Sequence, residues 1–210
     1  RPLAALDRLL QVGRSFAKVP PVSLMADGTL QVRLPDLYLT GGLKFIGALK
    51  WVRETYDPDW VYRTTVSSYV HVPGLVEFAG NVDPRVDWVG TPVGHPRGIF
   101  ASGTNFLLSR RLVDWVLAEA HRWPHRYLED VALGVLLGES GFCLHEIPSQ
   151  WIHSPDQVDD LSVAELRAVW HWRCRSADAA GQRLDPWIME RLSRRYQDLT
   201  ESPRTEGSHA

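Results

Sequence analysis

Hydrophobic and polar positions along the chain change their period several times, and each change predicts a new element of secondary structure. Apolar residues that recur every three to four positions, as Phe45, Leu49 and Val52 do, predict amphipathic helices. Short apolar runs bounded by turn residues, such as Asp27-Gly28, predict strands. The predicted helices cover residues 3–17, 43–55, 75–79, 110–122, 128–139, a segment that opens at 162, and 185 to about 199. The predicted strands cover residues 22–25, 30–34, 60–66, 88–90, 142–147 and part of 99–108, with a loop over 91–98.

Several of the predicted helices also carry signals at their ends. Ser109 is a candidate N-cap, because a serine hydroxyl can accept a hydrogen bond from the unpaired N–H groups of the first turn. Ser162 and Glu165 have the spacing of a capping box. Asp185-Pro186 is expected to start the last helix, and Gly141 to close the helix over 128–139.

The alternation of strands and helices predicts an α/β fold, a Rossmann-like three-layer α/β/α sandwich with a mainly parallel sheet. One domain is expected over residues 1–200, followed by a disordered polar tail over 201–210. In sheets of this kind, ligands bind beyond the carboxyl ends of the strands. Candidate chemistry is therefore expected on the loops at that edge.

The composition narrows the class of protein only a little. A net charge of -2 over 210 residues argues against a protein that grips nucleic acid mainly through its phosphate backbone, although a local basic patch stays open. No apolar run is long enough to span a bilayer and no signal peptide is visible, so we expect no membrane span and a cytoplasmic location. Cys143 and Cys174 are expected to be free thiols, with a single disulfide as the alternative.

Five segments carry patterns that point to a known family. They are Gly13-Arg14-Ser15-Phe16, Asp36-Leu-Tyr-Leu-Thr-Gly-Gly-Leu-Lys44, Trp60-Val-Tyr-Arg-Thr64, Ala101-Ser-Gly-Thr-Asn-Phe-Leu-Leu-Ser-Arg110 and Leu128-Glu-Asp-Val-Ala-Leu-Gly134. In this order they resemble motifs of the Fringe and β-1,3-galactosyltransferase group of GT-A glycosyltransferases. The resemblance covers about residues 10 to 148. It implies a GT-A-like fold whose first strand would lie before residue 1, so the sequence is expected to begin inside a longer protein.

The resemblance also implies which residues act. An inverting transfer needs a carboxylate that takes the proton of the acceptor hydroxyl, and the group's Glu-Asp-Val motif assigns this role to Asp130, with Glu129 beside it. Both acids open a predicted helix, where the helix dipole stabilises negative charge. The alternative is that they are ordinary acids of a first helical turn.

Other residues of the same motifs are candidates for binding the substrates. Four of them are expected to contact the donor and its diphosphate, namely Arg14, Asp36, Lys44 and Arg63. Another four, Ser102, Gly103, Thr104 and Asn105, are expected to bind the acceptor or a sugar, because glycine permits close approach and the polar side chains offer donors and acceptors. The alternative for the charged residues is that they are simply solvated. The alternative for residues 102–105 is an ordinary turn.

One departure from the group concerns a divalent metal such as manganese. Where the group has the two carboxylates of Asp-x-Asp, this chain has Thr65 and Ser67, whose neutral hydroxyls are poor ligands for a hard cation. Because they occupy those places, both residues are still expected to contact the donor and its diphosphate. Period-two alternation predicts a strand that places His171, Arg173 and Arg175 on one face, where they could bind the diphosphate directly. The alternative is an exposed basic strand face without a ligand. No metal site is therefore predicted. Fringe-like enzymes place a histidine beside the metal, and His153 is the second candidate for that histidine besides His171.

The sequence thus predicts an inverting glycosyltransferase that uses a nucleotide sugar, with UDP as the expected nucleotide. The acceptor stays open between a glycan, a small molecule and a macromolecule, and a DNA or protein acceptor is not excluded. The alternative from another class is a catalytically inactive module that binds carbohydrate or nucleotide on the same fold.

Overall fold

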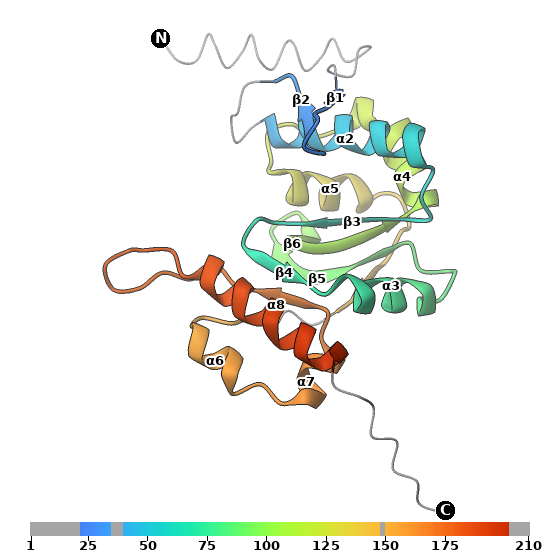
Figure 1. Cartoon of the computed structure of the whole chain (residues 1–210). Coiled ribbons are helices and arrows are strands. Elements are labelled where there is room, and N and C mark those ends of the chain that lie inside the picture. Colours follow the sequence, from blue (N-terminus) through green and yellow to red (C-terminus); the bar gives the residue numbers. More distant parts are fainter. Residues whose placement is uncertain (1–21, 35–39, 148–149, 202–210) are drawn as a thin grey trace, which may run out of the picture. The chain divides into compact units, whose positions relative to one another are not determined.

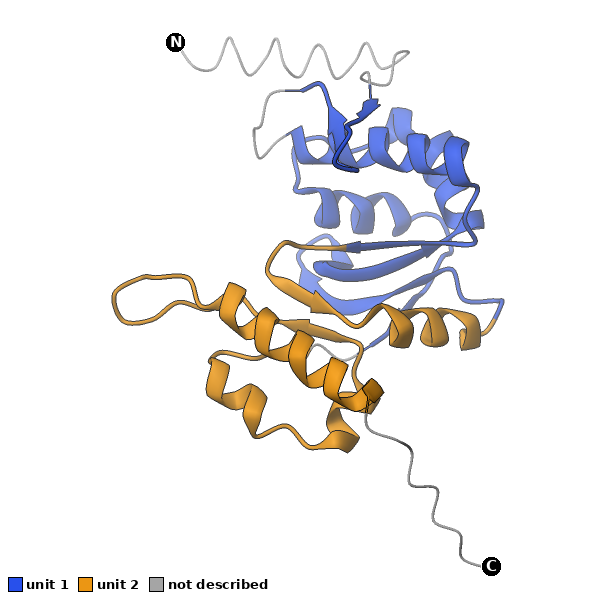
Figure 2. Cartoon of the chain, in the orientation of Figure 1, with its two compact units in different colours: residues 1–63, 84–147 blue, residues 64–83, 148–210 orange. Residues whose placement is uncertain are grey.

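The computed structural model describes residues 22–34, 40–147 and 150–201. The predicted helix over 3–17 and the candidates Arg14 and Asp36 lie outside these residues. The chain divides into two compact units, shown in Figure 2: unit 1 comprises 1–63 and 84–147, and unit 2 comprises 64–83 and 148–210. That residues 1–200 form a single domain stays a prediction.

Unit 1 contains most of the regular secondary structure of the described chain (Figure 1). Its elements are β1 (Val22–Leu24), β2 (Leu30–Val32), α2 (Gly41–Tyr56), β3 (Trp60–Thr64, whose last residue belongs to unit 2), β5 (Trp88–His95), β6 (Gly98–Ser109), α4 (Arg110–Ala118), the 3-10 helix η2 (Ala120–Arg122), α5 (Glu129–Leu137) and β7 (Leu144–Glu146). β1 and β2 form a separate antiparallel hairpin. The other strands form a sheet in the order β3-β6-β5-β7.

The sheet is mixed: β5 pairs with β6 in antiparallel and with β7 in parallel orientation. The α/β class is confirmed, but the prediction of a mainly parallel sheet is not. In unit 1, α2, α4 and α5 lie together on one side of the sheet (Figure 1), so helices on both faces are not confirmed either. The reason lies in residues 91–98, which were predicted as a loop but form the end of β5, a two-residue turn and the start of β6 in one long antiparallel hairpin. Pro92 is tolerated there because the ladder is irregular next to it.

The core of unit 1 forms where α4 and α5 pack on β6. Its fully buried side chains include Phe106, Leu108, Leu112, Val116 and Leu133. Ser109 caps α4 as predicted, since its hydroxyl accepts a hydrogen bond from the Leu112 N–H at 3.1 Å. The capping box of Ser162 and Glu165 is confirmed as well.

α5 approaches β6 unusually closely at Gly134. A Cβ at this position would lie 2.4 Å from the Cβ and 2.9 Å from the Cα of Phe100. Only a residue without a side chain allows this approach, which presses the helix against the strand. The first turn of α5, with Glu129 and Asp130, is thereby held against the same strand.

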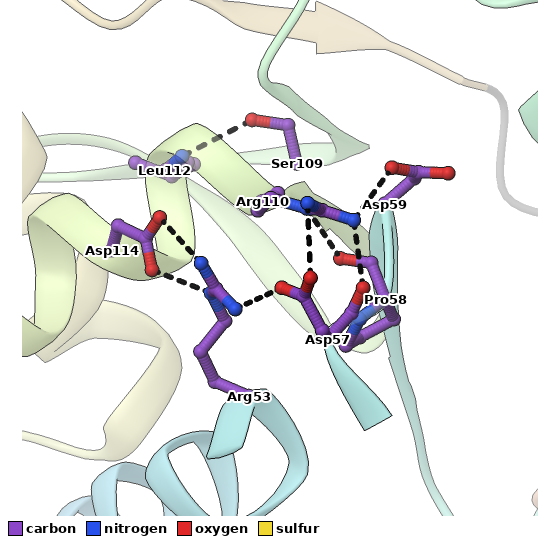
Figure 3. Close-up of polar contacts among 8 residues, drawn as sticks. All are labelled: Arg53, Asp57, Pro58, Asp59, Ser109, Arg110, Leu112 and Asp114. Carbon is purple, nitrogen blue, oxygen red and sulfur yellow. Dashed lines mark hydrogen bonds and ion pairs between the residues drawn. The ribbon is translucent and has the colours of Figure 1, made fainter. Parts of the chain in front are cut away.

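A network of charged side chains joins the end of α2 to the start of α4 (Figure 3). Arg53 donates to Asp114 with an Nε–Oδ1 distance of 2.6 Å and also pairs with Asp57. Arg110 donates to the Asp57 carbonyl at 2.7 Å and to the Asp59 carboxylate at 3.0 Å. The network closes the turn that leads into β3 and so fixes where that strand begins.

Unit 2 contains β4 (Ser68–Val70), α3 (Val72–Asn81), α6 (Pro155–Asp159), α7 (Val163–Ala168), β8 (His171–Arg173) and α8 (Asp185–Glu201). β4 and β8 form a two-stranded antiparallel pair. Trp172 on β8 donates to the Tyr196 hydroxyl of α8 at 3.0 Å, within a core that also buries Ile188 and Leu192. Of the predicted tail, only Glu201 is described, as the last residue of α8.

The strand over 171–173 is confirmed, but His171, Arg173 and Arg175 do not share one accessible face. His171 is 3% exposed and Arg173 is 6% exposed, so only Arg175 lies on the surface. β8 pairs with β4 along one edge, while the Arg173 N–H donates to the Gln150 carbonyl at 2.7 Å. Because neighbouring segments enclose the strand, alternation along it does not separate buried from exposed side chains.

No helix among residues 22–34, 40–147 and 150–201 is long and apolar enough to cross a membrane. Both cysteines are free thiols: Cys174 is buried, whereas Cys143 is exposed.

Replacing Gly134 should test the close approach of α5 to β6. The Cβ of Gly134→Ala would overlap with Phe100, including its backbone, so we expect the free energy of unfolding to fall by about 1–3 kcal/mol. Gly138→Ala is the matched control on the same helix, because the nearest atoms to its Cβ would lie at an ordinary 3.5 Å. Urea denaturation measures both variants, and equal stabilities would contradict the packing.

Candidate functional site

The residues predicted to bind the acceptor form a bulge inside a strand. Phe106 of β6 lies opposite Gly90 of β5, and Ala101 lies opposite Pro92, so that residues 102–105 face the single residue Thr91. The predicted turn at Ser102–Asn105 is therefore an insertion within the twelve-residue strand β6. Bulges bend a strand and redirect its polar groups, and they are common beside active sites.

The bulge holds the carboxylate of Asp130. The Gly103 N–H donates to Asp130 Oδ2 at 2.9 Å, and the Val131 N–H donates to Oδ1 at 2.8 Å. Both donors are backbone groups, so the carboxylate is fixed without a charged partner. Each carboxylate oxygen keeps a second lone pair that can accept a proton.

Arg63, near the end of β3, lies beside the Gly103 bulge and the two acids at the start of α5. Its Nη2 forms an ion pair with Glu129, and its Cζ lies 5.7 Å from the centre of the Phe106 ring. Its Nη1 is buried and has no hydrogen-bond partner among the described residues. A Cβ on Gly103 would lie 2.7 Å from this Nη1 and 2.9 Å from Asp130 Oδ2. The guanidinium and the Asp130 carboxylate therefore both lie against Gly103, and a side chain at this position would have to displace them.

That Arg63 contacts the donor stays a prediction, and in the structure its guanidinium forms an ion pair with Glu129. Glu129 and Arg63 both line a pocket of about 830 Å³, which is within the usual range for ligand sites. Lys44 of α2 lines the same pocket, whose other wall comes from the β1–β2 hairpin with Asp27 and Leu30. Two predicted donor residues thus share a pocket with one of the predicted catalytic acids.

The remaining bulge residues differ in their exposure. The hydroxyls of Ser102 and Thr104 lie 3.0 Å apart and are partly exposed, as a contact with a sugar would require. Asn105 is 1% exposed, and its Oδ1 has no hydrogen-bond partner in the described chain. Asn105 is therefore corrected to a buried residue of the strand, since burial leaves it no surface for a sugar.

In unit 2, Arg173 contacts the residues that replace the two carboxylates of Asp-x-Asp. Its Nη1 donates to the Thr65 hydroxyl, to the Ser67 carbonyl at 3.3 Å and to the Ser68 hydroxyl at 3.5 Å. Within the described residues no carboxylate lies within ion-pair distance of it, and its buried Nε has no partner. Burial lowers the pKa of Arg173, and the charges of Arg175 and Arg183 lower it further, while the negative charge of Asp185 acts in the opposite direction. An arginine nevertheless stays protonated, so this is a buried positive charge with only neutral acceptors.

Arg183 is a residue of this cluster that the sequence did not reveal. Its Nη2 donates to the Ser67 hydroxyl at 2.8 Å, and its Nε donates to Asp185 Oδ1 at 2.6 Å. The hydrogen bond from Arg183 lowers the pKa of the Asp185 carboxyl. Asp185 starts α8, as predicted. The sequence signal that could have found Arg183 is its position two residues before Asp185, the first residue of α8.

His153 is exposed and stacks on Trp151 with ring centres 5.7 Å apart. Across the residues that the structure describes, no three histidine, cysteine or acidic side chains are grouped as they would be around a metal ion. The set around Thr65 and Ser67, which consists of hydroxyls and guanidiniums, is chemically unsuited to a divalent cation.

No protein-family model matches the chain, and no curated protein matches it either.

Replacing Gly103 should move the carboxylate of Asp130. In Gly103→Ala the new Cβ would fall between Arg63 Nη1 and Asp130 Oδ2, and both are ends of side chains that can swing away. We therefore expect a crystal structure to show the carboxylate displaced, with little change in thermal stability. Gly94→Ala in β5 is the control, because no atom lies within 4 Å of its Cβ position. An unmoved Asp130 would show that the contact is not tight.

Proposed function

We propose that the protein is an inverting glycosyltransferase of GT-A type that moves a sugar from a nucleotide sugar to an acceptor hydroxyl. The observation that carries the proposal is the convergence, within unit 1, of three motifs that are far apart in the sequence. Arg63, Gly103 and the pair Glu129-Asp130 come from three different segments and meet at the start of α5, where Arg63 bonds to Glu129 and Gly103 bonds to Asp130.

In the proposed reaction, Asp130 accepts the proton of the acceptor hydroxyl as its oxygen attacks the anomeric carbon of the donor. The bond between that carbon and the diphosphate oxygen breaks, and its electron pair leaves with the nucleoside diphosphate. Attack and departure occur on opposite faces, so the configuration at the anomeric carbon inverts. Asp130 suits the role because two backbone N–H groups orient it, while its remaining lone pairs stay able to take a proton.

Glu129 has a different role in this proposal. Its pairing with Arg63 neutralises the second carboxylate of the motif, so that only one acid at the start of α5 lacks a charged partner in an ion pair. Arg63 is therefore proposed to position the acids rather than to bind the donor. The pocket that Arg63, Glu129 and Lys44 line is a candidate for binding part of a substrate.

A binding module without catalysis is the second candidate function. The observation that favours it is the hydrogen bonding of both Asp130 oxygens, because such bonds also serve simply to brace a bulge. The two candidates differ in one respect: a transferase releases nucleotide from its donor only when an acceptor and Asp130 are both present.

Asp130→Asn should abolish transfer and leave folding nearly unchanged, because the side chain keeps its size but loses its capacity as a base. The expected loss in rate is about a hundredfold to ten-thousandfold. Nucleotide release, measured across a panel of UDP-sugars and other nucleotide sugars with saccharide acceptors, reports the activity. Glu129→Gln, the neighbouring acid, should lose less.

The affinity for the donor, measured by thermal shift, should be the same in Asp130→Asn and in the unaltered protein. An Asp130→Asn variant that retains full turnover would reject Asp130 as the base. Donor binding without any turnover across the panel would instead favour the binding module.

A further inference from the structure

Unit 2 contains a pocket of its own, lined by residues for which the proposed transfer has no role. Its volume of about 550 Å³ is within the usual range for ligand sites. The lining comes from the start of α3, from α7 and from the last turns of α8, and every lining residue belongs to unit 2. It includes two apolar side chains, two charged side chains and two stacked rings, namely Pro73, Leu199, Glu77, Arg167, His71 and Tyr196.

The ring of His71 is held in the wall of this pocket by stacking. It lies on the Tyr196 ring with centres 4.2 Å apart and an interplanar angle of 17°, and Tyr69 stacks on Tyr196 at 5.5 Å. Tyr196 is fixed in turn, because its hydroxyl donates to the Val169 carbonyl and accepts a hydrogen bond from Trp172 at 3.0 Å. The aromatic wall of the pocket is therefore preformed.

The imidazole of His71 offers its polar groups to this pocket. Neither ring nitrogen has a hydrogen-bond partner in the described chain. Burial lowers the pKa of His71, so near pH 7 the ring is neutral and has one N–H donor and one acceptor. Gly74, another lining residue, leaves room for the ring, since a Cβ there would lie 3.0 Å from His71 Nδ1 and 3.0 Å from the Trp170 Cβ.

The formal charges of the lining cancel. Glu77 and Arg167 both line the pocket, and neither has an ion-pair partner among the residues that the structure describes. With His71 neutral, the lining carries one negative and one positive charge. Both charged side chains are exposed, and an exposed ion pair with a charged ligand contributes little. The pocket therefore favours neither an anion nor a cation.

We propose that this pocket binds a neutral saccharide. A sugar carries several hydroxyls around an apolar ring face, so it can donate to Glu77, accept from Arg167 and form hydrogen bonds with the nitrogens of His71. The apolar side chains of Pro73 and Leu199 suit the ring face. A nucleotide or an amino acid would use fewer of these groups. The inference goes beyond the proposed transfer, because the site is complete within unit 2 and includes no group of unit 1.

The test is NMR titration of the whole chain with three neutral disaccharides, lactose, maltose and N,N′-diacetylchitobiose. We expect at least one of them to bind with millimolar affinity and to shift the imidazole C–H signals of His71, which are assigned by their absence in His71→Phe. This variant keeps a ring that can stack on Tyr196 but has no ring nitrogen, and it should weaken binding by about tenfold.

Glu77→Gln and Arg167→Gln should also weaken saccharide binding by about tenfold, as expected for lost hydrogen bonds to charged groups. The matched controls are Glu190→Gln and Arg194→Gln, which alter an exposed ion pair on α8 outside the lining of the pocket. Both should bind as the unaltered protein does. Circular dichroism spectra verify that all of these variants are folded.

Binding of none of the three disaccharides, or binding that leaves the His71 signals unshifted, would overturn the proposal. Larger shifts with UMP or with glycine would overturn it as well, because they would indicate an anion or a zwitterion as the ligand. So would equal affinities in the pocket variants and their controls.

Asp130→Asn separates this result from the proposed function, because it should shift the His71 signals as the unaltered protein does. Saccharide binding that depends on Glu77 and Arg167, together with full transfer by Asp130→Asn, would reject the proposed base and leave the saccharide site standing. Transfer that depends on Asp130, without any saccharide effect on His71, would leave the proposed function standing and reject this site.

Discussion

The close approach of α5 to β6 is the constraint on which the arrangement of unit 1 depends. At Gly134 the helix lies so near to Phe100 that a methyl group has no room, and one turn further toward its start the helix presents Asp130 to the bulge. A helix held at one end by packing and at the other by a hydrogen bond to Gly103 cannot slide along the strand. The packing of α5 in the core therefore determines where the Asp130 carboxylate lies.

The two units differ in the partners of their charged side chains. In unit 1, Arg63 pairs with Glu129, and the hydrogen bonds to the Asp130 carboxylate come from backbone N–H groups. In unit 2, the positive charges of Arg173 and Arg183 are directed at hydroxyls, with Asp185 balancing one of them.

Sequence patterns predicted the local elements well and their assembly less well. The helix cap at Ser109, the hairpin around Asp27-Gly28 and the start of the last helix at Asp185 are present, because each depends on residues only a few positions apart. Residues 91–98 were predicted as a loop from their prolines and glycines, yet most of them belong to strands. Pairing with β6 outweighs their local preference, and a pairing partner is not visible in the segment itself.

The sequence by itself determined the α/β class, the start of α5 at two acids and the replacement of two carboxylates by Thr65 and Ser67. Only the tertiary structure decided that Arg63 pairs with Glu129, 66 positions away, and that Arg183 reaches Ser67 across 116. Caps and turns are fixed by short-range hydrogen bonds that neighbouring residues specify. Partners at long range are chosen by how helices and strands pack, and that choice minimises the free energy of the whole chain, which no local pattern records.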